Sequence, residues 1–330
     1  MTTFFLNRLA TEPHALAFAG QSTPWPVALA DQTTDPSLDE ALRGHVAAAG
    51  RLLTPVAADL LATTGRPVDL FGFAPNPARL GAAADATASV EGVALTQLGA
   101  LLDLEHLGYG VAQAKPLAVL GHSQGVLAVH MTRAIEAAGS IEAAGTTLDE
   151  ILAVAALIGA AGTRRVRELG LNPKHGEASP MLSVKGATRV QVEALVARVN
   201  NARGPISIAV TNSDNHHVLS GYPEDLAAFA LEAEREHQHQ AKLREQKLHG
   251  GTVFNPTLEY LEVTLPFHSP LMADAVEQTV AWAGACGFDQ KRTRALAEEV
   301  LLNHVDWNAR VKALFDAADP SKLWIVDLGP

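Results

Sequence analysis

The chain has 330 residues, of which 48% are hydrophobic and 18% are charged, and its net charge is −11. This is a globular composition, and the length suffices for one large core or two domains. The negative net charge argues against nucleic-acid binding. The single cysteine, Cys286, excludes an internal disulfide and a cysteine-based zinc cluster. The longest apolar stretch, 151–162, is well short of the ~20 residues that span a bilayer, and the first residues lack the basic start of a secretory signal, so we expect no membrane partner and a cytoplasmic location.

The first half of the sequence predicts strands that alternate with helices. In chain order these are a strand over 15–19, a mostly helical region over 38–104 with breaks at 65–67 and 75–77, a strand over 116–120, and helices over 126–138 and 148–169. Strands followed by helices in this way predict an α/β unit with a parallel sheet.

The pattern changes after residue 180. It predicts strands over 181–186, 206–210, 217–220 and 258–264, and helices over 189–199 and 223–236, followed by a polar helix end and loop over 235–251. Strand–helix–strand–strand–helix–strand is the order of a ferredoxin-like subdomain. We assign this subdomain to 181–254, inserted into an α/β-hydrolase-like core made of 1–180 and 255–330. A last strand is predicted over 323–328, and because the chain stops directly after it, we expect a domain cut from a longer polypeptide.

The segment 121–125, Gly-His-Ser-Gln-Gly, lies between a predicted strand and a predicted helix, as in a nucleophile elbow. The chain turns so sharply there that side chains on either side of the serine would collide, which explains the two glycines. We predict that Ser123 is a nucleophile. The backbone N–H of Gln124, at the start of the helix, would stabilise negative charge on an attacked carbonyl.

A serine nucleophile needs a base, and His268 is our candidate because Pro266 and Pro270 restrict the backbone on both sides of it. The alternative is a turn histidine that caps the next helix. His122 adjoins the serine, but neighbours in an elbow point apart. The second oxyanion donor should come from a loop after a neighbouring strand, where Gln21 lies; alternatively Gln21 is an ordinary turn residue.

The other histidines of the small subdomain are expected at the surface; these are His216, His217, His237, His239 and His249. His237 and His239 lack the spacing of a helical metal pair, so we predict no metal site.

Several motifs occur in a fixed order along the chain: 18–21 (FAGQ), 121–125 (GHSQG), 212–213 (NS), 217–221 (HVLSG), 267–272 (FHSPLM), 305–307 (VDW) and 326–330 (VDLGP). This series resembles the acyl-CoA:acyl-carrier-protein transacylases, the malonyl and acetyl transferases of fatty acid and polyketide synthases. It is most similar to the N-terminal acetyltransferase domain of fungal and actinobacterial type I fatty acid synthases.

The resemblance implies a Ser123–His268 dyad without a third acidic residue, and an oxyanion hole made by the backbone N–H groups of Gln21 and Gln124. A backbone carbonyl between Val300 and Asn303 would orient the histidine. The implied acyl-pocket residues are Ala161, Gly162, Asn212 and Phe267. No permanently bound cofactor is implied.

Malonyl-selective relatives carry an Arg-Gly pair on the helix after the elbow, whereas the matching pair here is Ala161-Gly162. A malonyl carboxylate buried there would lack its partner. A slipped alignment would restore it, since Arg164 and Arg165 are only three and four residues away. The resemblance therefore implies a starter-unit acetyltransferase that works through an acyl-serine. Its substrate would be acetyl-CoA, its acceptor the phosphopantetheine arm of an acyl carrier protein, and its other partners the remaining domains of the synthase.

Three alternatives stay open. The chain is a transacylase for malonyl or other acyl groups, a serine esterase or thioesterase with Asp214 or Asp225 as third member of a catalytic triad, or a non-catalytic docking domain.

A cluster of three arginines, Arg164, Arg165 and Arg167, has two interpretations. The arginines contact CoA phosphates or an acidic carrier protein, or they form a solvated helix end.

Overall fold

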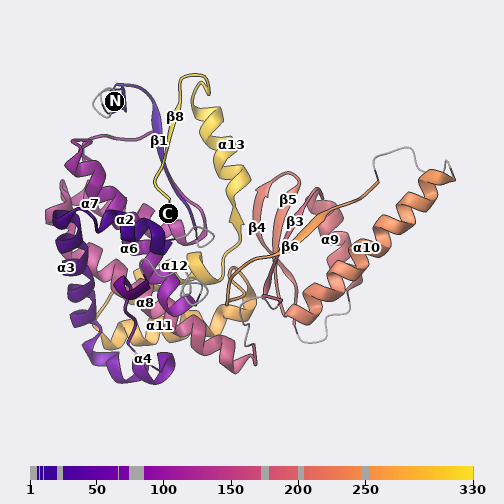
Figure 1. The fold of residues 1–330 in the computed structure, drawn as a ribbon, viewed down its shortest axis with the longest axis horizontal. Helices are drawn as coiled ribbons and strands as arrows, with labels where there is room; N and C mark the ends of the chain where they lie inside the picture. The colour runs from indigo at the N-terminus through magenta and orange to yellow at the C-terminus, as the bar shows by residue number, and fades with distance from the viewer. Residues whose placement is uncertain are drawn as a thin grey trace.

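The computed structural model describes residues 6, 8–9, 11–20, 25–65, 67–73, 85–171, 178–199, 204–246 and 253–329. A large, mostly helical unit and a smaller unit with an antiparallel sheet lie side by side (Figure 1). The first and last described strands, β1 (His14–Phe18) and β8 (Trp324–Asp327), belong to the large unit, and the small unit is inserted between them. The predicted fold class is thus confirmed, with a hydrolase-like large subdomain and a ferredoxin-like small one. The predicted helix break at 75–77 lies outside the described residues.

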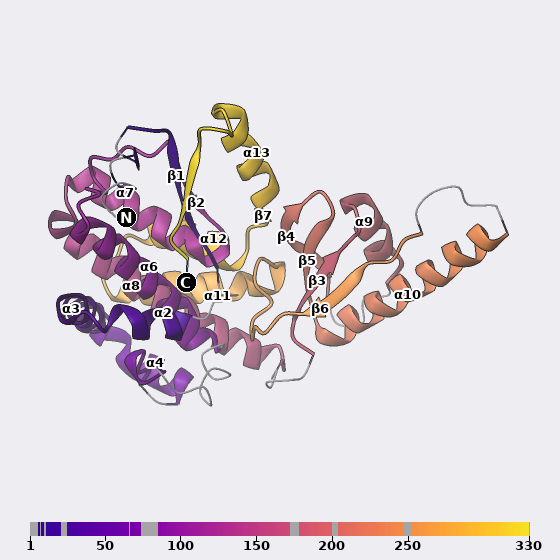
Figure 2. The same cartoon turned by 45° about the horizontal axis from the view of Figure 1, so that its top comes forward.

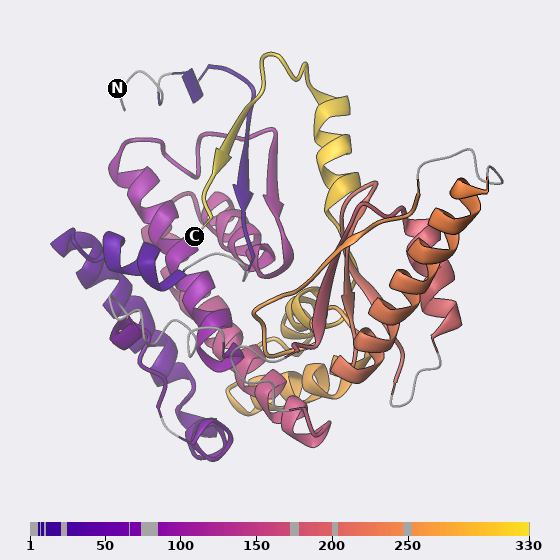
Figure 3. The same cartoon turned by 45° about the vertical axis from the view of Figure 1, so that its right-hand side comes forward.

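The sheet of the large subdomain has three described strands, with β1 (His14–Phe18) between β2 (Ala118–Gly121) and β8 (Trp324–Asp327). Both neighbours run parallel to β1, as the arrowheads in Figure 3 show. The register pairs Phe18 with Gly121 and Ala17 with Asp327, so the carboxyl ends of all three strands meet at one edge. Ligands of open parallel sheets bind beyond this edge.

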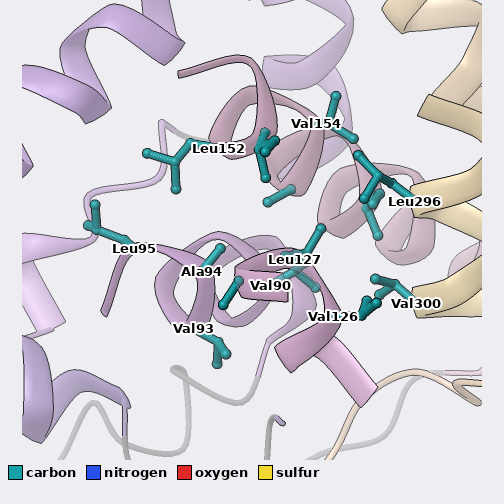
Figure 4. Packing of buried hydrophobic residues seen from close by; sticks show 14 of the residues in the cluster. Val90, Val93, Ala94, Leu95, Val126, Leu127, Leu152, Val154, Leu296 and Val300 are labelled. Carbon is teal, nitrogen blue, oxygen red and sulfur yellow. The ribbon is translucent and has the colours of Figure 1, made fainter. Parts of the chain in front are cut away.

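Helices surround that sheet. They are α2 (Trp25–Gln32), α3 (Pro36–Leu52), α4 (Ala57–Thr64), α6 (Ala86–His106), α7 (Val126–Ala138), α8 (Ile141–Glu168), α11 (Ala273–Ala285), α12 (Gln290–Leu301) and α13 (Trp307–Ala317). α8 packs against α3, α6, α7 and α11. Figure 4 shows Leu152 and Val154 of α8 in the shared core with Ala94 of α6 and Leu127 of α7.

α8 begins seven residues earlier than predicted. The Ser140 hydroxyl accepts a hydrogen bond from the Ala143 N–H at 3.1 Å and so caps the helix before its apolar part starts. With 28 residues, α8 is long and apolar enough to cross a membrane by length and composition alone. Most of its apolar window is buried inside the protein, as in the core helix of a globular domain.

The small subdomain has a five-stranded sheet covered by two helices. The strand order is β6 (Thr257–Tyr260), β3 (Met181–Lys185), β5 (His216–Ser220), β4 (Ser207–Ser213) and β7 (Val305–Asp306), and the helices are α9 (Arg189–Arg198) and α10 (Pro223–Glu245). The sheet has its own apolar core, which includes Leu182, Leu219 and Phe229. β6 and β7 both follow residue 254, so the sheet extends past the predicted boundary into the segment that returns to the large subdomain.

α10 is longer than predicted because it continues through the polar run to Glu245 and projects beyond the sheet (Figure 1). Side-chain contacts one turn apart support it there: Gln238 bonds Glu234 at 2.6 Å and Gln240 bonds Glu236 at 2.7 Å. Such pairs are not visible in a search for apolar periodicity. The rest of the expected loop falls largely on 247–252, outside the described residues.

Candidate active site

The elbow is packed so tightly that neither of its glycines can carry a side chain. A Cβ at Gly121 would lie 2.5 Å from the Val126 nitrogen, and one at Gly125 would overlap the carbonyl oxygen of Phe18. Between them, the 3-10 turn η4 (Ser123–Gly125) leads into α7, and Ser123 has a φ of 52°. The left-handed backbone places the serine at the carboxyl edge of the parallel sheet.

The structure brings the two predicted dyad residues together from positions 145 residues apart. Ser123 Oγ lies 2.8 Å from His268 Nε2, and His268 Nδ1 lies 2.8 Å from the carbonyl oxygen of Asn303. A carbonyl only accepts, so Nδ1 carries the proton and Nε2 is the acceptor that faces the hydroxyl. His268 also has a left-handed backbone, with a φ of 55°, and the next residue, Ser269, donates its N–H to the Leu301 carbonyl at 3.2 Å.

The His268 ring is neutral at physiological pH. It is only 2% exposed, and this burial lowers its pKa to about 3, although the Asn303 carbonyl acts in the opposite direction. His122, His304 and Arg310 also lower this pKa through their charges. A neutral imidazole with a free Nε2 lone pair is the form that accepts a proton from serine.

The loop after β1 touches the elbow. A Cβ at Gly20 would lie 3.0 Å from both the Ser123 Cβ and the His122 carbonyl oxygen. The buried amide of Gln97, from α6, donates to the carbonyl oxygen of Ala19 at 2.6 Å. Gln124 is buried in η4. Gln21 lies outside the described residues, so its part in an oxyanion hole stays a prediction.

The predicted acyl-pocket residues on α8 adjoin the segment that carries His268. Ala161 and Gly162 are buried, and a Cβ at Gly162 would overlap the Leu265 side chain. Phe267 is also buried, with its ring centre 6.4 Å from that of His268. All three positions carry apolar groups, and their part in an acyl pocket stays a prediction.

The arginines that follow on α8 bind protein groups. Arg165 Nε donates to the Leu271 carbonyl at 3.0 Å, and its Nη1 lies 2.8 Å from Asp274. Arg164 bonds Glu168 and Gln278, and Arg167 donates to the Thr63 carbonyl. These contacts support a role in fastening α8 to α4, α11 and η5 (Pro270–Met272).

Asn212 lies next to the elbow, and its part in an acyl pocket stays a prediction. Its Oδ1 is 2.8 Å from His122 Nε2, so it contacts the neighbour of the nucleophile from the small subdomain. The His122 ring also meets Trp307 edge-on, with ring centres 5.3 Å apart, and its burial lowers its pKa. Arg310 Nη1 donates to the Gly121 carbonyl at 2.7 Å. The 305–307 motif included Trp307, whereas no local pattern indicated Arg310.

The remaining candidates lie apart from His268 Nδ1, which is bonded to the Asn303 carbonyl. Asp214 lies after β4, bonded to Lys312 and Asn308 at 2.7 Å each, and the Lys312 bond lowers the pKa of its carboxyl. Asp225 lies in the first turn of α10. The Val300 side chain is in the apolar core, so within the predicted stretch it is Asn303 that orients the histidine.

The small-subdomain histidines differ from the surface expectation at three described positions: His217 is buried, and His216 and His237 are half-buried. His217 is 1% exposed, with Nδ1 3.3 Å from Thr211 Oγ1, because it lies in β5, where every residue from 217 to 220 is buried. His239 is exposed, and His249 lies outside the described residues. The described part of the chain contains no group of three or more His, Cys, Asp or Glu side chains arranged to hold a metal ion.

An elbow serine that faces a buried neutral histidine, at the carboxyl edge of a hydrolase-like sheet, defines the class of serine-dependent acyl-transfer proteins. The comparisons agree. Residues 180–260, which include β3 to β6 of the small subdomain, match the family model described as the fatty acid synthase central AT domain.

Two curated relatives are fungal fatty acid synthases. The chain is 30% identical over 163 residues to the fatty acid synthase beta subunit TOXC of Cochliobolus carbonum, a match that covers 45% of this chain and 8% of the relative. It is 29% identical over 168 residues to fatty acid synthase 2 of Mycosarcoma maydis, with 48% of this chain and 4% of the relative covered. The matched segments are thus less than a tenth of each relative's length.

Solved structures show the same fold over nearly the whole chain. The malonyl-CoA:acyl carrier protein transacylase (FabD) of Xanthomonas oryzae pv. oryzae has a TM-score of 0.63 at 17% identity, with 96% of this chain and 94% of that chain covered. The acyl carrier protein S-malonyltransferase of Vibrio cholerae has a TM-score of 0.61 at 14% identity, with 96% and 90% covered. The chain therefore shares the fold of these transacylases, and its residues 180–260 resemble the acyltransferase domain of fatty acid synthases.

Proposed function

We propose that this chain is the acetyl-CoA:acyl-carrier-protein S-acetyltransferase that loads the starter unit of a type I fatty acid synthase in the cytoplasm. The acyl-transfer chemistry rests on one observation, the 2.8 Å contact between Ser123 Oγ and His268 Nε2. The selectivity for acetyl groups is supported by the apolar pair Ala161-Gly162 and by the contacts that occupy Arg164 and Arg165 elsewhere.

In the first half-reaction, Ser123 Oγ attacks the thioester carbonyl of acetyl-CoA and His268 Nε2 takes the hydroxyl proton. The Nδ1–H bond to the Asn303 carbonyl keeps the ring in place while it carries the charge. Backbone N–H groups of Gln124 and Gln21 would stabilise the oxyanion. When the carbon–sulfur bond breaks, His268 returns the proton to the CoA thiolate and acetyl-Ser123 remains.

In the second half-reaction, the thiol of the carrier protein's phosphopantetheine arm attacks acetyl-Ser123 while His268 Nε2 takes its proton. Collapse of the intermediate returns that proton to Ser123 Oγ and releases the acetylated carrier protein. The two half-reactions use the same base in turn, which is a ping-pong mechanism. No resident cofactor takes part in this scheme.

A second candidate is malonyl transfer, because several of the structurally similar proteins are named malonyltransferases. Intact-mass analysis after exposure to acetyl-CoA or malonyl-CoA separates the two. We expect a one-acetyl mass increase that disappears in Ser123→Ala, and little malonyl adduct. Equal or preferential malonyl loading would contradict acetyl selectivity, and the absence of any adduct would contradict the proposed chemistry.

A further inference from the structure

α13 lies between the parallel sheet of the large subdomain and the sheet of the small one (Figure 2). From it, Arg310 reaches the elbow, where Nη1 donates to the Gly121 carbonyl at 2.7 Å. Gly121 is the last residue of β2 and lies two residues before the nucleophile. A guanidinium bonded to a carbonyl is a charge-assisted contact, stronger than a neutral one.

The same face of α13 contacts the next residue of the elbow. Trp307 lies one helical turn before Arg310, and its ring meets His122 edge-on. His122 is also bonded to Asn212 from β4. Side chains from outside the elbow thus hold both residues that precede Ser123.

This support matters because the φ of 52° at Ser123 is unfavourable for a residue with a side chain. Such a conformation persists only where the surroundings determine it. If residues 121 and 122 shift, Ser123 moves with them, and its oxygen loses the 2.8 Å contact with His268 Nε2.

α13 is itself well anchored. Asp306 caps it by accepting a hydrogen bond from the Ala309 N–H at 2.9 Å, and Asn308 bonds Asp214 of the small subdomain. Directly before the helix, β7 pairs with β4, with Thr211 opposite Asp306. The guanidinium is therefore presented from a fixed position.

We propose that Arg310 is a positioning residue for the nucleophile: through the Gly121 carbonyl it holds the elbow so that Ser123 Oγ stays within reach of His268 Nε2. This inference rests on the proposed role of Ser123 as nucleophile. The charge of Arg310 also lowers the pKa of both His268 and His122. A different role, binding of CoA phosphates, would leave the elbow unaffected.

The test uses two variants and one control. Arg310→Met removes the donor and the charge at similar length, and Arg310→Lys keeps a cationic donor. Lys312→Met is the control, because it removes a positive charge two residues further along α13, from an exposed ion pair with Asp214 that does not contact the elbow. Acylation of Ser123 is timed with acetyl-CoA and with p-nitrophenyl acetate, which carries no phosphate.

For Arg310→Met we expect the acylation rate to fall about tenfold with both substrates, because the loss of one charge-assisted hydrogen bond has about this effect. The KM for acetyl-CoA should stay unchanged. Arg310→Lys should lie between this variant and the wild type, and Lys312→Met should match the wild type. Rates are normalised to the folded fraction from melting curves, so that unfolding does not imitate the effect.

Wild-type rates in Arg310→Met would overturn the proposal. A loss of acylation rate seen only with acetyl-CoA, or only as a raised KM, would also overturn it, because either result would indicate phosphate binding. An equal loss of rate in Lys312→Met would overturn it as well, because it would indicate a general effect of charge. If Arg310→Met does not fold, the acylation rates of Arg310→Lys and Lys312→Met are compared instead. Equal rates overturn the proposal, and a lower rate in Arg310→Lys supports it. Failure of the wild type to acylate with either substrate would instead refute the proposed function.

Discussion

Among the described residues, three non-glycine positions have a positive φ, and two of them are Ser123 and His268; the third is Lys115. Each such conformation costs about 1–3 kcal/mol, so their occurrence at both members of the dyad indicates that the surrounding contacts maintain them. For His268 these contacts are the Asn303 carbonyl at Nδ1 and the bond from the Ser269 N–H to Leu301.

The lowered pKa of His268 predicts an unusual pH dependence. Because burial moves this pKa from 6.5 to about 3, the proton that inactivates the base binds only in strong acid. The initial rate of Ser123 acylation at low substrate should therefore show no acid limb near the ordinary histidine value of ~6.5. Stopped-flow acylation between about pH 5 and 7.5 measures this. A limb centred near the ordinary value would contradict the burial seen here.

Ala161 predicts a change of selectivity. In Ala161→Arg, a guanidinium beside the acyl pocket should bind a malonyl carboxylate bidentately, so malonyl loading should rise by about tenfold or more relative to acetyl loading. Thr163→Arg is a matched control, because it introduces the same side chain two residues along α8 at a half-buried position. Mass spectrometry of the two acyl adducts measures the ratio.

A serine-reactive fluorophosphonate probe establishes that the Ala161→Arg variant keeps an intact dyad. If it reacts with the probe and malonyl loading is unchanged, the alignment of Ala161-Gly162 with the Arg-Gly pair is wrong. A rise in Thr163→Arg alone would place the acyl pocket further along the helix.

At the scale of elements, the elbow and β1 form one unit. Gly125 touches the Phe18 carbonyl, so Gly125→Ala should lower the free energy of unfolding by about 1–3 kcal/mol and abolish acylation, because the elbow must move. Gly145→Ala in α8 is the contrasting substitution. Its added Cβ has no atom within 4 Å, so stability should rise by about 0.5–1 kcal/mol with unchanged acylation.

Urea unfolding of the two variants measures both effects. A Gly125→Ala protein of wild-type stability and activity would show that the elbow tolerates the methyl group. That result would contradict the close approach between η4 and β1.

The elements that could be predicted from the sequence are those whose information is local. The elbow is a contiguous motif between an apolar strand and a helix, and helix α7 has its predicted bounds, 126–138. The prolines on both sides of His268 made it the candidate base, and the resemblance then supported it. The role of Arg310 depends on a contact with Gly121, 189 positions away, and no periodicity reveals that. β7 has only two residues, which are too few to show a strand pattern. α10 continues beyond its last periodic apolar residue because pairs of polar side chains stabilise its end.

On the scale of the whole molecule, the site draws on both subdomains, and its histidine is shielded from solvent. Ser123 and His268 belong to the large subdomain, Asn212 reaches them from the small one through His122, and His268 is almost fully buried. In a serine esterase, water must reach the acyl-serine readily. In a transferase, exclusion of water preserves the acyl group until a thiol arrives.

We therefore predict that acetyl-Ser123 persists in buffer and is discharged rapidly when pantetheine is added. Intact-mass spectra, taken at intervals after removal of acetyl-CoA by rapid gel filtration, follow the adduct with and without the thiol. N-acetylethanolamine, which has the amide but no thiol, is the control and should not accelerate discharge. Release of free acetate at the same rate in all three conditions would identify a hydrolase instead, because the dyad would then admit water as readily as its acceptor.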